Sequence, residues 1–230
     1  MECRKGTYHT NKGESTMNGL LYAPSGGGKT CNATLVAAPN RGRNLLICTD
    51  NSSIVLRNFD RPNLDIVNVS SVKEFVDTYR AGYESKKYDN IILDNLSDCI
   101  DMWLLELDDS GKFKDFRQAY QLVYQSLKRL SRESTTLDCN TIFTAWMDTV
   151  ELTAPSGELI TRMQPKIPAK ILDNVCGLMN VVAYINTAVD KDGNKRWYYV
   201  TESKPTLMAK DQIACRKSCM PADIFTIPQK

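Results

Sequence analysis

Short apolar runs alternate with segments of helical periodicity along most of the chain. Strand-length apolar runs occur at residues 19–23, 45–48, 65–69, 91–93 and 141–146. The fourth of these runs is apolar at consecutive positions, which favours a parallel strand buried on both faces of a sheet. This alternation predicts an α/β fold with a mostly parallel central sheet flanked by helices.

Helices are expected between these runs. The first extends from Lys29 to about Ala38, and the second begins at Ser71, which can form a capping box with Glu74. Residues 96–133 are predicted to be helical in two pieces separated at Gly111. Helical spacing gives the second piece one apolar stripe, formed by Phe116, Tyr120, Val123, Leu127 and Leu130.

The C-terminal third predicts β-hairpin additions to the sheet. Residues 153–157 are typical of a hairpin tip or a flexible loop. The apolar runs 181–185 and 196–200 flank residues 190–194, whose Asp-Gly pair is a strong turn signal. Because no repeat or low-complexity linker divides the chain, we expect an N-terminal extension over residues 1–16 and one domain over residues 17–230.

Composition and charge leave the function open. The 230 residues include 42% hydrophobic and 24% charged residues, and the formal net charge is +2. A DNA-binding surface would therefore depend on local clustering of Lys and Arg. The polar N-terminus and the lack of a run of about 18 apolar residues predict no secretory signal, no membrane partner and a cytoplasmic protein.

The cysteines indicate neither disulfides nor zinc. There are 8 of them, they are scattered, and His9 is the only histidine. Only Cys215 and Cys219 come near the spacing of metal ligands. We expect reduced thiols, with three cysteines packed as small apolar residues, namely Cys48, Cys99 and Cys176.

A glycine-rich segment directly follows the first apolar run. Residues 23–30 have the sequence Ala-Pro-Ser-Gly-Gly-Gly-Lys-Thr, which fits a phosphate-binding loop with alanine in place of the usual first glycine. The glycines let successive backbone N–H groups point at phosphates, and the positive end of the next helix adds to that field. The predicted nucleotide-binding residues are Pro24, Ser25, Gly26, Gly27, Gly28, Lys29, Thr30 and Cys31.

Lys29, Thr30 and Asp94 are expected to act on ATP and Mg²⁺. Lys29 would bridge the β- and γ-phosphates, and the Thr30 hydroxyl would hold Mg²⁺. Asp94 ends the run at 91–93, where a carboxylate can hold Mg²⁺ through a water; the alternative is a simple turn or helix cap. The motif predicts a protein that binds and hydrolyses ATP.

Hydrolysis also needs a group that orients or deprotonates the attacking water. Asp50, just beyond the run at 45–48, is the candidate; the alternative is an ordinary turn residue. Thr144 and Trp146, at the end of the run at 141–146, are candidate sensors of the γ-phosphate. A tryptophan at such a position is more often a packing residue.

These motifs resemble the RecA-type ATPase core. More specifically, they resemble the short phage-encoded, AAA-type ATP-binding proteins related to RecA, which include single-strand-annealing recombination proteins of the Sak group. The resemblance is carried by the phosphate loop and by residues 47–50, 91–94 and 142–146, with residues 165–168 and 209–211 also similar. It implies a RecA-like fold and a DNA-recombination or replication ATPase in the cytoplasm of a bacterial host. It also implies single-stranded DNA as a partner, a homo-oligomer, and a single-strand-binding protein as a further partner.

Two residues depart from the RecA-like pattern. Asp50 lies where these proteins have a catalytic glutamate, so its shorter side chain implies slow turnover. Trp146 lies where they often have glutamine or histidine, and an indole cannot act as the same polar sensor. Neither departure affects the prediction of nucleotide binding.

The resemblance also implies contacts outside the phosphate loop. A basic residue should reach the ATP of a neighbouring subunit, and the candidates are Lys191, Lys195, Arg196 and Lys204. DNA contacts are expected in two loops, at residues 110–117 and 147–170. The second contains Arg162, Lys166 and Lys170, which suit phosphate contacts, but no aromatic residue for base stacking.

Two other functions stay open. A small-molecule or nucleotide kinase can begin with the same loop, although Arg129, Arg132 and Arg162 form no compact lid in the sequence. An ATP-gated adaptor or loader would need only slow hydrolysis, consistent with the short side chain of Asp50. Stimulation of ATP consumption by single-stranded DNA would distinguish the recombination ATPase from both.

Overall fold

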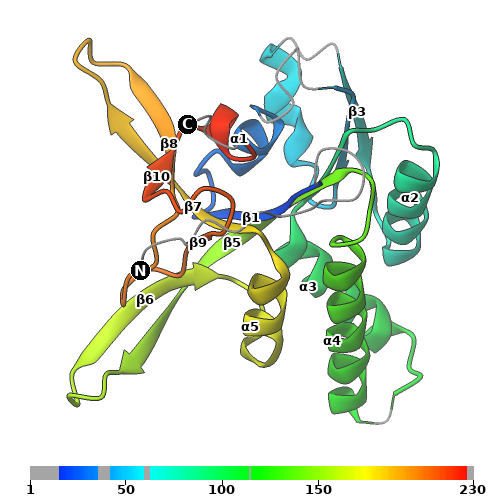
Figure 1. Ribbon diagram of the computed structural model, residues 1–230. Helices are drawn as coiled ribbons and strands as arrows, with labels where there is room; N and C mark the ends of the chain where they lie inside the picture. Colours follow the sequence, from blue (N-terminus) through cyan, green and yellow to red (C-terminus); the bar gives the residue numbers. More distant parts are fainter. Residues whose placement is uncertain (1–15, 36–41, 60–62, 114, 227–230) are drawn as a thin grey trace.

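The computed structural model describes residues 16–35, 42–59, 63–113 and 115–226 (Figure 1). The elements are β1 (Asn18–Ala23), α1 (Lys29–Leu35), β2 (Asn44–Cys48), η1 (Ser52–Asn58), β3 (Leu64–Asn68), α2 (Val72–Glu84), β4 (Asn90–Asp94), α3 (Leu96–Asp109), α4 (Phe116–Glu133), β5 (Asn140–Thr153), β6 (Leu159–Pro165), α5 (Ala169–Leu178), β7 (Val181–Val189), β8 (Lys195–Val200), β9 (Lys210–Asp211), β10 (Ser218–Cys219) and η2 (Pro221–Asp223). The predicted end of the first helix, near Ala38, and most of the predicted N-terminal extension lie outside the described residues.

The central sheet is mostly parallel, as predicted. Its strand order is β10-β8-β7-β1-β5-β4-β2-β3, with β6 paired to β5 and β9 paired to β7. All neighbours from β7 to β3 along this order are parallel, whereas β6, β8, β9 and β10 are antiparallel additions. The carboxyl ends of the parallel strands therefore meet at one edge of the sheet.

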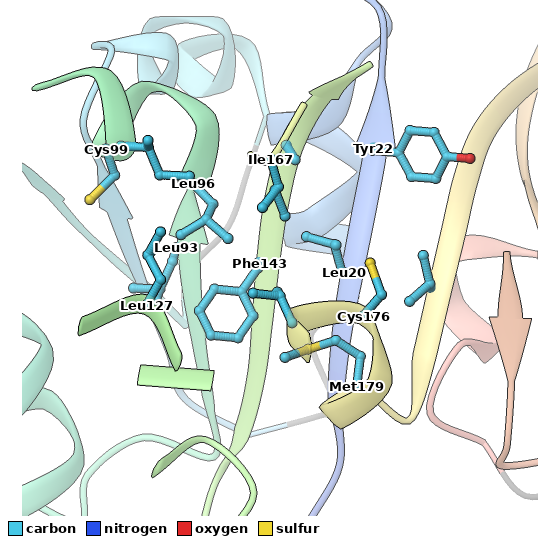
Figure 2. Packing of buried hydrophobic residues seen from close by; sticks show 14 of the residues in the cluster. Leu20, Tyr22, Leu93, Leu96, Cys99, Leu127, Phe143, Ile167, Cys176 and Met179 are labelled. Carbon is cyan, nitrogen blue, oxygen red and sulfur yellow. The ribbon is translucent and has the colours of Figure 1, made fainter. Parts of the chain in front are cut away.

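Helices cover both faces of the sheet. Because successive strand residues point to opposite faces, neighbours such as Leu20 and Leu21 belong to different apolar clusters. The larger cluster joins the sheet to α2, α3, α4 and α5, and Figure 2 shows Phe143 within it, between Leu127 and Met179. The smaller cluster lies under α1, η1 and η2. Among the described residues, none of the helices is both long and apolar enough to span a membrane.

Two local predictions about helices are only partly correct. In the stripe on α4, Val123 and Leu127 are buried, but Phe116 is 41% exposed and its ring meets Tyr120 edge-to-face instead of the core. At the start of α2, Ser71 accepts the backbone N–H of Glu74 at 3.2 Å. The Glu74 carboxylate does not complete a capping box with Ser71, because it accepts hydrogen bonds from Ser70.

Asparagine side chains connect the beginnings of the parallel strands. Asn90 on β4 donates its side-chain amide to Asn44 on β2 at 2.6 Å, and Asn140 on β5 donates to Asn90 at 2.9 Å. Asn18 and Asn180 exchange two hydrogen bonds, each from a backbone N–H to the other side chain. These contacts hold five strand starts in register, so the opposite ends are also aligned.

The stretch expected as a loop at residues 147–170 is mostly regular structure. β5 continues past Trp146 to Thr153 and pairs with β6, from Met147 opposite Pro165 to Thr153 opposite Leu159. We call this hairpin, residues 147–165, the β5–β6 arm; it projects from the body of the protein (Figure 1). Its tip lies at the predicted turn, and β-branched residues such as Thr149 and Val150 favour the extended backbone.

The other loop expected to contact DNA is separated from the end of β4 by a helix. Asp94 is followed almost directly by α3, which begins at Leu96 and has 14 residues. At about 1.5 Å per residue, this helix carries the chain about 20 Å away from the end of β4. Residues 110–113 and 115–117 therefore lie at the far end of α3, away from the carboxyl edge of the sheet.

Several of the described cysteines are packed as small apolar residues. No disulfide forms among the seven cysteines that the structure describes, and Cys48, Cys99 and Cys176 are buried as predicted. Burial raises the pKa of each of these three thiols to about 12. Within the same described ranges, no group of three or more His, Cys, Asp or Glu side chains is placed to bind a metal.

Candidate active site

The glycine-rich loop begins where β1 ends, at the carboxyl edge of the sheet. Gly26 and Gly28 have φ angles of 73° and 80°, which glycine adopts readily. A Cβ on Gly27 would lie 2.7 Å from the Ala23 Cβ and 2.9 Å from the Pro24 oxygen, so a side chain there would distort the loop. Pro24, Ser25 and Gly26 are exposed, and Lys29 and Thr30 are buried behind them.

Lys29 is a buried cation without an anionic partner within hydrogen-bond distance in the described ranges. It is 8% exposed, and its Nζ donates to the backbone oxygens of Ala23 at 3.4 Å and Pro24 at 3.1 Å. Burial lowers the pKa of Lys29, and the nearby charges of Asp94 and Asp50 act in the opposite direction. A phosphate anion at this loop would supply the negative charge that Lys29 lacks, because the two carbonyl oxygens are neutral.

Asp94 lies at the end of β4, is 2% exposed and accepts hydrogen bonds from three hydroxyl groups. Thr30 donates to Oδ2 at 2.6 Å, Ser52 donates to the same oxygen at 2.8 Å, and Thr144 donates to Oδ1. Burial raises the pKa of Asp94, and the three hydrogen bonds partly oppose this shift. We call these four residues the Asp94 cluster.

The Asp94 cluster fits Mg²⁺ by its chemistry. Its donor groups are one carboxylate and three hydroxyl oxygens, and Mg²⁺ prefers oxygen ligands. Mg²⁺ sites in nucleotide-binding proteins typically use one or two carboxylates together with substrate phosphates and waters. Thr30 and Asp94 were predicted for this role, whereas Ser52 was missed because no motif marks the position after Asp50-Asn51.

Asp50 lies just beyond β2 and is held from two sides. Its Oδ2 accepts the Asn95 side-chain amide at 2.7 Å, and its Oδ1 accepts the Ser52 backbone N–H at 3.0 Å. Asp50 is exposed, and its charge contributes to the raised pKa of Asp94. Asn95, which sequence reasoning read only as part of a helix start, positions the candidate water-activating carboxylate.

The two sensor candidates have different surroundings. Thr144 belongs to the Asp94 cluster through its hydroxyl group. Trp146 donates its backbone N–H to Ser97 at 3.0 Å, and its ring lies 4.9 Å from the Nζ of Lys166. The sequence predicted that Trp146 lies at the tip of its strand. This is wrong, because β5 continues beyond Trp146 into the arm.

The three basic residues predicted to contact DNA lie in separate surroundings. Arg162, on β6, lines a cavity of about 270 Å³ together with Asp173 and Lys210. Lys166 forms an ion pair with Asp101 at 3.5 Å, in addition to its contact with Trp146. Lys170 is exposed in the first turn of α5.

The β5–β6 arm itself is not a uniformly basic surface. Alongside Arg162 it carries three acidic residues, namely Asp148, Glu151 and Glu158. Contacts with DNA phosphates in this region would therefore depend on the base of the arm, where Lys166 and Lys170 lie.

The basic residues proposed to reach a neighbouring subunit are all exposed. They lie in the β7–β8 turn, on β8 and beyond it, at Lys191, Lys195, Arg196 and Lys204. The Arg196 Nε contacts the Asp190 Oδ2 at 2.6 Å within the same hairpin. The hydrogen bond from Arg196 is the main cause that lowers the pKa of Asp190 to about 2.

Comparison with known proteins agrees with the geometry of this site. The model of a family described as an AAA domain matches residues 15–213, which is most of the chain. This family is one of P-loop ATPases. No curated protein matches the chain.

Proposed function

The chain belongs to the AAA-domain family of P-loop ATPases, and on that premise we propose that it binds ATP at the β1–α1 loop and hydrolyses it there. One observation carries this proposal. Thr30 and Asp94, which are 64 residues apart in sequence, meet through a hydrogen bond of 2.6 Å. A glycine-rich surface loop without this function would not require a buried carboxylate at its end.

The loop residues are arranged to bind the triphosphate. Backbone N–H groups around Gly26 and Gly28 are suited to the phosphate oxygens, and Lys29 supplies a buried positive charge. Thr30 and Asp94 would hold Mg²⁺, which when bound withdraws charge from the β- and γ-phosphates. Ser52 and Thr144 orient the Asp94 carboxylate from two sides.

Asp50 is the proposed water-activating residue. Its carboxylate is exposed, so water can reach it, and Asn95 and Ser52 hold its orientation. Both of its oxygens already accept hydrogen bonds, so an attacking water must share them with Asn95 and Ser52. Slow turnover is therefore expected.

The finer proposal is that this ATPase serves DNA recombination or replication by binding single-stranded DNA as a homo-oligomer. The supporting observation is the course of β5. Thr144 on this strand contacts Asp94, and the same strand continues into the projecting β5–β6 arm. A change at the Asp94 cluster on hydrolysis can thus be transmitted along one strand to a surface outside the site.

A second candidate is an ATP-gated adaptor or loader. It is favoured by the hydrogen bonds that already occupy both oxygens of Asp50. A kinase is less well supported, because Arg129 and Arg132 lie on α4 whereas Arg162 lies on β6.

The deciding experiment is the steady-state ATPase rate with and without single-stranded DNA, at low and moderate salt. Stimulation that fades with salt supports the recombination ATPase. ATP binding without stimulation supports the adaptor. If the protein does not bind ATP at all, the proposal is wrong at its first step.

A further inference from the structure

The phosphate loop has an aromatic neighbour that the proposed reaction does not use. A Cβ built on Gly28 would lie 3.0 Å from the Nε1 of Trp197 and 3.2 Å from its Cε2. The pyrrole edge of this indole therefore rests against the loop backbone. Trp197 is only partly buried, so the rest of its ring can meet a ligand.

The neighbouring contacts of β8 hold Trp197 at this position. Tyr199, two residues further along, lies on the same face of the strand. It is fully buried, and its hydroxyl group donates to the backbone oxygen of Asn32 on α1 at 3.1 Å. This face of β8 thus runs along α1 and reaches the loop at Trp197.

The strand register places Trp197 at the height of the loop. Tyr22 on β1 is level with Tyr184 on β7, which is level with Val200 on β8. Trp197 is level with Thr187, three residues beyond Tyr184. At about 3.4 Å per residue, Trp197 lies about 10 Å beyond the level of Tyr22. The loop leaves the sheet one residue after Tyr22, at the end of β1.

Trp197 and Asp94 lie on opposite sides of the loop. In the order β8-β7-β1-β5-β4, each of their strands is two positions from β1. Neighbouring strands are about 4.8 Å apart, so each side chain begins about 10 Å to its own side of the loop. Because Asp94 marks the Mg²⁺ and γ-phosphate end of the proposed site, the nucleoside end of the ligand extends toward Trp197.

We propose that Trp197 binds the nucleoside part of the nucleotide by stacking its indole on the base, within the same subunit. This inference rests on the proposed function, because it assigns one end of the same site. Stacking uses the π face that every base has, so Trp197 contributes affinity with little discrimination between adenine and guanine. The ligand class is a nucleoside triphosphate held at both ends, by the Asp94 cluster and by the indole.

Calorimetric titration with ATP and with inorganic triphosphate, both with Mg²⁺, tests this assignment. Trp197→Ala should weaken ATP binding about tenfold, because the stacking contact is lost, and should leave triphosphate binding within about twofold. Trp197→Phe should keep most of the ATP affinity. Tyr198→Ala is the matched control, since Tyr198 is the adjacent aromatic residue on the opposite face of β8, with its hydroxyl bonded to Asn186.

Two results would overturn the role of Trp197. One is unchanged ATP affinity in Trp197→Ala. The other is an equal loss for ATP and triphosphate, which would mean that Trp197 only supports the loop. Failure of the wild-type protein to bind either ligand would instead overturn the proposed nucleotide site, so the two failures are distinguishable.

Discussion

Asn95 donates its side-chain amide to Asp50, with 2.7 Å between Nδ2 and Oδ2, and accepts the Asp98 backbone N–H at its Oδ1. One buried side chain therefore caps α3 and orients the candidate water-activating carboxylate. It also joins the end of β2 to the start of α3, next to Asp94. The position of Asp50 thus depends on a residue that local sequence presents only as a helix cap.

Asn95→Asp should separate these two roles. Aspartate can still cap the helix, but a second carboxylate buried beside Asp50 should lower stability by about 1–3 kcal/mol. It removes the donor to Asp50 and places a like charge beside it, so the ATPase rate should fall about tenfold with ATP affinity largely unchanged. Rate and affinity are measured on the same preparation. A wild-type rate in this variant would show that the Asn95 contact does not position the reacting group.

Asp50→Asn should preserve ATP binding and reduce hydrolysis by about 10²–10⁴-fold, because only the group that activates water is changed. Single-turnover hydrolysis and calorimetric ATP binding measure the two effects. The control is Asp148→Asn, on the β5–β6 arm. Normal turnover in Asp50→Asn would remove Asp50 from the mechanism.

Lys29→Ala should weaken ATP binding about 100-fold or more, since it deletes the buried cation beside the loop. Calorimetry gives the affinity directly. Lys73→Ala, at an exposed position on α2, removes the same charge elsewhere and should bind ATP normally. Undiminished affinity in Lys29→Ala would refute the assignment of the loop.

Asp94→Asn should stabilise the ligand-free protein while weakening Mg²⁺-dependent ATP binding. Burial raises the pKa of Asp94 above its unfolded value, so the native state holds its proton more tightly. Stability at this group is therefore greatest in acid and falls as pH rises through the raised pKa. Asparagine cannot ionise, so the variant does not lose this stability as the pH rises.

Thermal unfolding across pH tests this sign. The Tm of Asp94→Asn should exceed that of the wild type by about 2–4 °C at pH 8, which corresponds to a gain of about 1 kcal/mol in the free energy of unfolding. The difference should shrink as the pH falls toward 4. A difference that is constant with pH would mean that the carboxylate charge is not the cause.

Replacing Arg162, Lys166 and Lys170 together by alanine should weaken binding of single-stranded DNA and flatten its salt dependence. Three lost phosphate contacts would lower the slope of log K against log salt by about 2. Lys166 should contribute least to the slope of the three residues, because it is already paired with Asp101. A charge-matched control replaces three exposed lysines elsewhere, Lys73, Lys87 and Lys128. An unchanged slope would place the DNA surface elsewhere.

The local features of this protein follow from its sequence. Apolar runs predict the parallel strands because burial on both sheet faces requires them to be apolar throughout. The loop at Gly26–Lys29 is recognisable in the sequence, because the glycines that adopt its backbone angles and the lysine that supplies its positive charge are adjacent in the chain. The stripe on α4 is correct at Val123 and Leu127, where helical spacing alone decides which residues face the core.

The extent of β5 could not be predicted in this way. Beyond Trp146 the strand leaves the core, so its residues no longer show a buried face. Pairing with β6 holds the strand extended there, and this pairing depends on backbone hydrogen bonds that leave little trace in the pattern of side chains. The arm therefore resembles a loop in the sequence.

The completed site depends on the order of strands in the sheet. Ser52, Asn95 and Trp197 carry no motif. They gather at the site because the sheet places β4 and β8 two strands from β1, and β2 next to β4. Strand tendency and loop conformation are local properties of the backbone, which neighbouring residues determine. Contact between residues 45 or more positions apart requires the packed sheet, because only there do distant segments share one edge.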